Sequence, residues 1–274
     1  MTENPIVAEL PGTRTEVLKR LVKNNITGMP VIKADDGTLV GFVTRQDIFA
    51  KPDEEQLALV IRRDIQTIGA NASVKDAARL MVEHELSHLP VVEKGKLVGI
   101  LTPTDLLIVV EKDNPQVSVE DIVRSPCIPI YHGAPLTVAL ATFRAAKVYA
   151  LPVLDDDAKL VGIITDRDIF NQTIVDSGVV MSDLGISDDE DNWTWEGLRN
   201  VMKLWYEVSR VDLPKITVKE IMVKNPMTVF RKTLVGDAAR IMRKNDFGQL
   251  PVRDSKDNLV AMIYDIDVVS TLTK

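Results

Sequence analysis

The sequence is short of the residues on which several classes of protein depend. It contains one cysteine, Cys127, so an internal disulfide is excluded and a reducing compartment is expected. Its three histidines do not form a cluster with metal-ligand spacing. No apolar run approaches the ~18 residues that cross a bilayer, and no secretory signal is visible at the N-terminus. We therefore expect a cytoplasmic protein that does not span a membrane.

Positive charge is also in short supply. The chain has 33 Lys and Arg against 40 Asp and Glu, and this net charge of −7 disfavours non-specific binding to nucleic acid. The chain lacks a glycine-rich phosphate loop and any Ser/His/Asp or Cys/His arrangement typical of nucleophilic catalysis. We therefore do not expect an enzyme.

The sequence does contain one pattern four times. Each copy has an apolar-Pro step into a strand, a polar turn, a second apolar strand and a Thr-x-x-Asp motif, with Tyr for Thr in the last copy. The prolines are Pro30, Pro90, Pro152 and Pro251. The first three are 60 and 62 residues apart and the last two are 99 apart, which indicates an insert of about 37 residues. Self-similarity of this kind predicts a repeat architecture.

Each copy predicts the same order of elements, which is strand, helix, strand, strand, helix. The first helix is predicted from apolar residues at three- and four-residue spacing, such as Val74, Ala78 and Met81. The two later strands form a hairpin around a polar turn, as at residues 34–37. A unit of about sixty residues buries too little apolar surface to be stable alone. We therefore expect an α/β (α+β) fold in which the first unit pairs with the second and the third with the fourth.

The repeat spacing also predicts the boundaries. The repeats are expected at residues 1–60, 61–114, 115–175 and 215–274, with the insert at residues 176–214. Within the insert, an acidic tract leads into a helical stripe that contains all three tryptophans. This stripe either packs on the third and fourth repeats or forms a surface for a protein partner or a homodimer.

The repeated unit, with its apolar-Pro-Val step and its Gly-apolar-apolar-Thr-x-x-Asp motif, resembles the cystathionine-β-synthase (CBS) domain. The four-copy layout is similar to the γ subunit of AMP-activated protein kinase and to stand-alone archaeal CBS proteins. The resemblance implies four β-α-β-β-α CBS units in two pseudo-twofold Bateman modules. It implies a regulatory, energy-sensing protein without a catalytic cofactor, which binds AMP, ADP, ATP or S-adenosylmethionine between paired units and signals to a protein partner.

By this resemblance, the motif residues contact the ribose and phosphate of the ligand. They are Thr44, Asp47, Thr102, Asp105, Thr165, Asp168 and, in the fourth copy, Asp267. A carboxylate can accept both hydroxyls of a ribose, and the N-terminus of a helix favours a phosphate. Weaker assignments to adenine or phosphate contacts are Val7, Met29, Gln66, His88, Leu89, Ile128, Ala150, Thr228 and Arg167.

The motif has a second interpretation that needs no ligand. Thr-x-x-Asp before an apolar run is also a helix N-cap, which stabilises a helix by about 1 kcal/mol. In the fourth copy, Tyr264 replaces Thr and Ala261 replaces Gly, so we expect a degenerate site there. The charge of His88 at neutral pH stays open. The alternative function is a nucleic-acid-binding protein or a structural scaffold with empty clefts.

Overall fold

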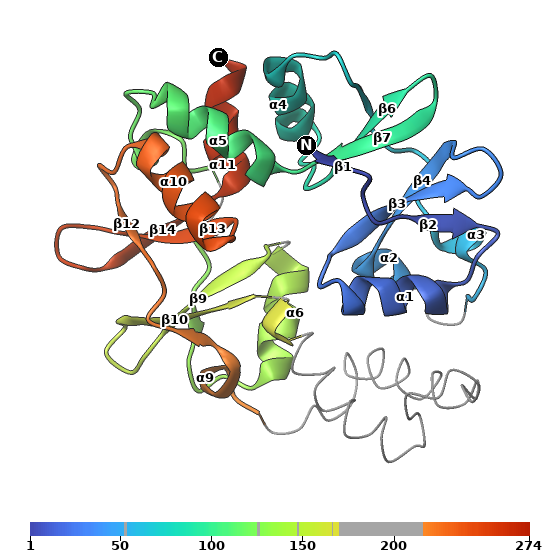
Figure 1. Ribbon diagram of the computed structural model, residues 1–274. Coiled ribbons are helices and arrows are strands. Elements are labelled where there is room, and N and C mark those ends of the chain that lie inside the picture. The colour runs from blue at the N-terminus through green and yellow to red at the C-terminus, as the bar shows by residue number, and fades with distance from the viewer. Residues whose placement is uncertain (52–53, 125–126, 147, 166, 170–215) are drawn as a thin grey trace. The chain divides into compact units, whose positions relative to one another are not determined.

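The computed structural model describes residues 1–51, 54–124, 127–146, 148–165, 167–169 and 216–274. The predicted insert and its tryptophan stripe lie outside these residues. The described strands form four small sheets, one for each predicted repeat (Figure 1). None of the helices in the described ranges is long and apolar enough to cross a membrane.

Within the described ranges, the elements follow the predicted order in each repeat. The first repeat contains β1 (Thr2–Glu3), β2 (Ala8–Leu10), α1 (Arg14–Lys23), β3 (Gly28–Lys33), β4 (Leu39–Thr44) and α2 (Arg45–Ala50). The second contains α3 (Leu57–Val60), β5 (Ile68–Gly69), α4 (Val74–Glu83), β6 (Leu89–Glu93), β7 (Lys96–Leu101) and α5 (Pro103–Asp113). The third contains η1 (Val119–Asp121), β8 (Ile130–Tyr131), α6 (Leu136–Ala146), β9 (Ala150–Leu154) and β10 (Leu160–Thr165). The fourth contains α9 (Val218–Ile221), β11 (Val223–Lys224), β12 (Val229–Phe230), α10 (Val235–Asn245), β13 (Gln249–Arg253), β14 (Leu259–Tyr264), α11 (Asp265–Val269) and η2 (Ser270–Thr273).

The four sheets share one register. In every repeat, a short strand lies parallel to the first hairpin strand, and one of its residues faces the residue that follows the proline. These pairs are Ala8 with Val31, Ile68 with Val91, Ile130 with Val153, and Val229 with Val252. The parallel strands are only two or three residues long. In the first and fourth repeats the residues before them include Pro5 and Pro226, which have no N–H to donate to a ladder.

Paired repeats exchange the residues that lead into them. Strand β1 lies antiparallel on β7 of the second repeat, with Thr2 opposite Ile100. In return, Arg62 in the leading segment of the second repeat forms a bridge with Phe42 in β4, through two N–H···O bonds of 2.9 Å. Strand β11 in the leading segment of the fourth repeat lies in the same way on β10, with Val223 opposite Ile163. The predicted pairing of first with second and third with fourth is confirmed.

The motif glycine permits this exchange. A Cβ atom at Gly41 would lie 2.5 Å from the carbonyl oxygen of Arg62. At Gly99 it would lie 3.1 Å from the carbonyl oxygen of Thr2, and at Gly162 it would collide with the side chain of Met222. The glycine of the repeat is therefore explained by the close approach of a backbone or a side chain from the paired repeat.

The described residues form two compact units. The first unit comprises Met1–Ile122, Thr233–Gly248 and Tyr264–Lys274, and the second comprises Val123–Lys232 and Gln249–Ile263. Within the first unit, α4 and α5 of the second repeat pack against α10, α11 and η2 of the fourth (Figure 1). An ion pair between Arg243 and Glu111, 2.7 Å long, joins α10 to α5. Within the second unit, Val218 and Met222 are buried in the core of the third repeat, which adds about 1.5–3 kcal/mol for each side chain.

The close approach at Gly41 leads to a test of the exchange. Gly41→Ala should lower the free energy of unfolding by about 1–3 kcal/mol, because a methyl group there forces the backbone of Arg62 away from β4. Gly69→Ala is the matched control, since a Cβ at Gly69 meets nothing within 4 Å. Urea denaturation should show the loss for the first variant and a change within about 0.5 kcal/mol for the second. Equal stability of the two variants would contradict this account.

Candidate functional site

The motif carboxylates all cap helices. In the first three repeats, Oδ2 of the motif aspartate accepts the N–H of its own threonine at 2.8 Å and the threonine hydroxyl at 2.6–3.2 Å. In the fourth repeat, Oδ2 of Asp267 accepts the N–H of Tyr264 at 3.0 Å. The interpretation of the motif as a helix cap is therefore confirmed.

A cap alone does not distinguish a ligand site. Ser118 with Asp121, and Thr217 with Glu220, form the same box outside the motif. In the motif, as in these two boxes, the cap uses only one carboxylate oxygen. Within the described part of the chain, Oδ1 of Asp47 and of Asp168 accepts no hydrogen bond, whereas Oδ1 of Asp105 lies 3.3 Å from the amino nitrogen of Met1. Capping therefore leaves an acceptor for a second partner.

A carboxylate, a guanidinium and an imidazole lie close together where the first and second repeats join. They belong to Asp47, Arg62 and His88. The Nε atom of Arg62 lies 3.0 Å from Oδ2 of Asp47. The ring of His88 stacks near Phe42, with 5.2 Å between ring centroids. Its Nε2 lies 3.2 Å from the hydroxyl of Thr27. The structure thus brings together the predicted Asp47 and His88, and it adds Arg62, which is not among the residues predicted from the sequence.

His88 does not supply the positive charge of this group. Burial, and to a smaller extent the neighbouring guanidinium of Arg62, lowers the pKa of His88 to about 4. The imidazole is therefore neutral at pH 7 and acts through hydrogen bonds. The cation is Arg62. Its only signal in the sequence is the pair Arg62-Arg63 in the link between repeats, and a pair of this kind usually belongs to a solvated surface.

The corresponding positions in the second and third repeats carry no cationic side chain. Arg62 faces Phe42, which lies two residues before the motif threonine. The residues that face the equivalent Ile100 and Ile163 are Thr2 and Val223. The three threonine-containing motifs thus have the same cap, but the first alone has an arginine at this register.

The residues that the sequence assigned more weakly to adenine or phosphate contacts fall into a buried group and an exposed group. The side chains of Met29, Leu89 and Ala150 are only 1%, 0% and 2% exposed, so nothing beyond their main chain could reach a ligand. The side chains of the other predicted residues are partly or fully exposed, and they are Val7, Gln66, Ile128, Thr228 and Arg167. A contact of these residues with adenine or phosphate stays a prediction.

The fourth motif is closed and acidic. Tyr264 and Asp267 are 7% and 2% exposed. Between them, Asp265 occupies the position that Arg45 and Pro103 hold in the first two repeats. Burial, together with the charge of Asp267, raises the pKa of Asp265 to about 7, although the N–H of Ile266 at 2.7 Å opposes the shift. A helix start that is both buried and acidic disfavours an anionic ligand in the fourth repeat.

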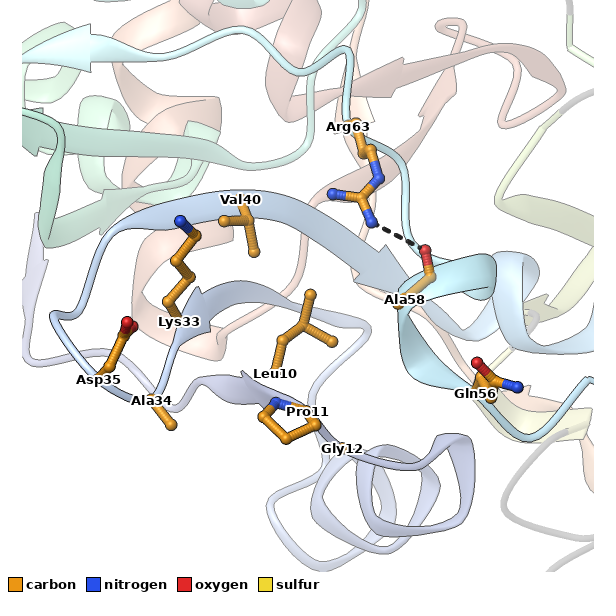
Figure 2. A pocket seen from close by; sticks show the side chains of 10 residues that line it. All are labelled: Leu10, Pro11, Gly12, Lys33, Ala34, Asp35, Val40, Gln56, Ala58 and Arg63. Carbon is orange, nitrogen blue, oxygen red and sulfur yellow. Dashed lines mark hydrogen bonds between the residues drawn. The ribbon is translucent and has the colours of Figure 1, made fainter.

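A separate hollow lies at the opposite end of the first hairpin from the motif (Figure 2). It has a volume of about 640 Å³ and is lined by Leu10, Pro11, Gly12, Lys33, Ala34, Asp35, Val40, Gln56, Ala58 and Arg63. It therefore contains none of the predicted site residues. Across the described ranges, no group of three or more His, Cys, Asp or Glu side chains could hold a metal ion.

The comparisons with known proteins agree with the repeat. The CBS domain family matches residues 1–54, 57–112, 119–173 and 218–274. Protein MJ1225 of Methanocaldococcus jannaschii is 29% identical over 187 residues, which are 62% of this chain and 66% of that protein. Its crystal structure, described as that of a proposed archaeal homolog of γ-AMPK, has a TM-score of 0.75 at 20% identity and covers 98% of this chain and 97% of that one.

Other relatives carry the same unit in different settings. An uncharacterized conserved protein from Pyrococcus horikoshii has a TM-score of 0.67 at 25% identity, covering 99% of this chain and 97% of that one. Inosine-5′-monophosphate dehydrogenase of Korarchaeum cryptofilum is 31% identical over 168 residues, which are 61% of this chain but 33% of that enzyme. The sequence matches thus span 66% of the length of MJ1225 and 33% of that of inosine-5′-monophosphate dehydrogenase, less than two thirds of each.

The raised pKa of Asp265 predicts a pH-dependent stability. The folded chain holds a proton that the unfolded chain releases above about pH 4, so the stability present at low pH is lost as the pH rises through about 7. Asp265→Asn should therefore raise the free energy of unfolding by about 1–3 kcal/mol at pH 8 and change it little at pH 4. Thermal melting at the two pH values measures this difference. The exposed Asp35→Asn is the control, and an equal effect of Asp265→Asn at both pH values would contradict the prediction.

Proposed function

Because the chain belongs to the CBS-domain family, we propose that it is a non-catalytic regulatory protein that binds an adenosine ligand between paired repeats. The ligand class comprises AMP, ADP, ATP and S-adenosylmethionine, and a protein partner reads the bound state. The observation that carries this proposal is the junction of the first two repeats. There, a capped carboxylate with a free oxygen lies beside an arginine and a neutral histidine.

The carboxylate suits a ribose because the cap holds it in place. The hydroxyl and N–H of Thr44 fix Oδ2 of Asp47, so little side-chain entropy is lost when the other oxygen accepts a ribose hydroxyl. A hydrogen bond to an ionised acceptor is about twice as strong as one between neutral groups. The same reasoning supports Asp168, whose Oδ2 is held by Thr165 in the same way.

A route to the partner follows from the packing of α5. This helix begins just after Thr102, with Asp105 in its first turn, and Glu111 near its end is paired with Arg243 of α10. Six residues of helix separate the two carboxylates, a rise of about 9 Å. A ligand on Asp105 would therefore act on the same rigid element that contacts the fourth repeat. We infer that occupancy is transmitted as a shift in how these helices pack.

The ligand-reading role can be separated from the cap by an amide. Asp47→Asn and Asp168→Asn each keep an oxygen that can cap the helix, but the amide nitrogen cannot accept a ribose hydroxyl. Each variant should weaken AMP binding at its own site by about 10–100-fold, the equivalent of one charge-assisted hydrogen bond. Titration calorimetry measures the loss. Asp121→Asn, which alters a cap outside the motif, should leave AMP affinity unchanged, and unchanged affinity in all three variants would refute the assignment.

Ligand class can be read from thermal stability. A ligand at 100 times its Kd should stabilise the protein by about 2.7 kcal/mol. Melting curves with AMP, ADP, ATP, S-adenosylmethionine and duplex DNA should show a shift with at least one adenosine compound and none with DNA. A shift with DNA alone would instead favour a nucleic-acid-binding protein.

A further inference from the structure

We propose that Arg62 makes the candidate site of the first repeat selective for adenosine ligands that carry a 5′-phosphate, whereas the equivalent site of the third repeat, which has Val223 at this register, is less selective. This inference rests on the proposed function, and it names the ligand feature that one site reads. Its basis is the placement of Arg62, which depends on the strand exchange between the paired repeats.

The backbone of Arg62 is held by two hydrogen bonds to Phe42. Its N–H donates to the carbonyl oxygen of Phe42 and its carbonyl oxygen accepts the N–H of Phe42, each at 2.9 Å. Phe42 lies two residues before Thr44, so the base of the arginine side chain is fixed beside the motif. Alternation along an extended chain sends the neighbouring Arg63 the other way. Its guanidinium donates to the carbonyl oxygen of Ala58 at 3.1 Å and borders the separate hollow (Figure 2).

The side chain of Arg62 uses only part of its binding capacity. It is 56% exposed, and Nε donates to Oδ2 of Asp47 at 3.0 Å. Among the described residues, none accepts a hydrogen bond from its two terminal nitrogens. These nitrogens present a planar donor pair that matches the oxygens of a phosphate. Asp47 and Arg62 can therefore act together, with Oδ1 of Asp47 on the ribose and the terminal nitrogens of Arg62 on the phosphate.

His88 does not add a second positive charge beside Arg62. The imidazole bonds to Thr27 and lies against Phe42, and it is neutral at pH 7. Arg45, in the first turn of α2, is 7% exposed, whereas the side chain of Arg62 is 56% exposed, so Arg62 is the guanidinium placed to distinguish a phosphorylated adenosine from an uncharged one at this junction.

The third repeat provides an internal comparison. Val223 pairs with Ile163 as Arg62 pairs with Phe42, and Asp168 is capped as Asp47 is. A ligand there would find the same ribose acceptor without a guanidinium at this register. Arg167 remains in the motif of the third repeat, so the third-repeat site should distinguish AMP from adenosine, but less strongly than the first-repeat site does.

The test isolates the first-repeat site in the full chain. Asp105→Asn and Asp168→Asn form the background, and Arg62→Gln or Arg63→Gln is added. The two added changes remove the same charge one residue apart. By calorimetry, Arg62→Gln should weaken AMP binding by about 10–100-fold and leave adenosine binding unchanged, because one charge-assisted contact is lost. Arg63→Gln should change neither affinity. Melting curves without ligand show whether each variant folds.

Different failures of this test have different meanings. Equal weakening of AMP and adenosine by Arg62→Gln would mean that Arg62 acts only by orienting Asp47, and it would overturn phosphate selectivity while the proposed function stands. Absence of binding by any adenosine compound to the unaltered protein would instead overturn the proposed function.

A second variant adds an arginine to the third-repeat site instead of removing one from the first. Val223→Arg, in a background of Asp47→Asn and Asp105→Asn, should raise the preference of the third-repeat site for AMP over adenosine, and an unchanged preference would count against the proposal.

Discussion

The exchange of leading residues between paired repeats is the interaction on which the rest of this structure depends. The free edge of each hairpin pairs with the leading residues of the other repeat in the pair. Arg62 pairs with β4 in this way, and β11 pairs with β10. An unpaired edge exposes backbone groups that must find partners. The exchange satisfies them, and it explains why glycine stands at positions 41, 99 and 162. It also places side chains of the leading segments next to the helix caps. The candidate site is therefore a consequence of how the repeats complete each other's sheets.

Under the proposed function, the motif carboxylate serves two purposes at Asp47 and Asp168. Capping stabilises the helix with Oδ2, and the same contacts hold the group so that Oδ1 would be offered to a ligand. The cap at Asp121 has the same geometry outside the motif, so the role of a capped aspartate depends on what lies beside it. This overlap means that a helix-start motif is under two physical demands at once. The loss of Thr in the fourth copy relaxes the hydroxyl contact, but the bond from the N–H of Tyr264 to Asp267 is kept.

The repeats share a fold and differ in electrostatics. Arg62 provides a cation in the first repeat, Val223 is neutral at the same register for the third, and Asp265 adds an acid in the fourth. Because sheet register and core packing tolerate these exchanges at partly exposed positions, charge can vary from copy to copy while the backbone does not. Four copies of one scaffold can therefore provide sites of unequal ligand preference. Such inequality would let one chain respond to a phosphorylated and an unphosphorylated adenosine compound separately.

The local sequence pattern was sufficient to predict much of the fold of this protein. The order of elements, the hairpins, the pairing of repeats and the helix starts at Thr44, Thr102 and Thr165 all follow from periodicity, proline placement and capping chemistry, which act over a few residues. The meeting of Arg62 with Asp47 and the neutral state of His88 do not follow from it. The first needs the strand exchange, which joins residues 15 positions apart, and the second needs desolvation by a neighbouring repeat. The burial of Met29 and Leu89, which leaves only their main chain for a ligand, is likewise a feature of the folded chain. The sequence by itself determined the repeated scaffold because secondary structure obeys short-range rules. Charge state and site composition were decided by the tertiary structure, since both depend on what distant segments bring within a few ångströms.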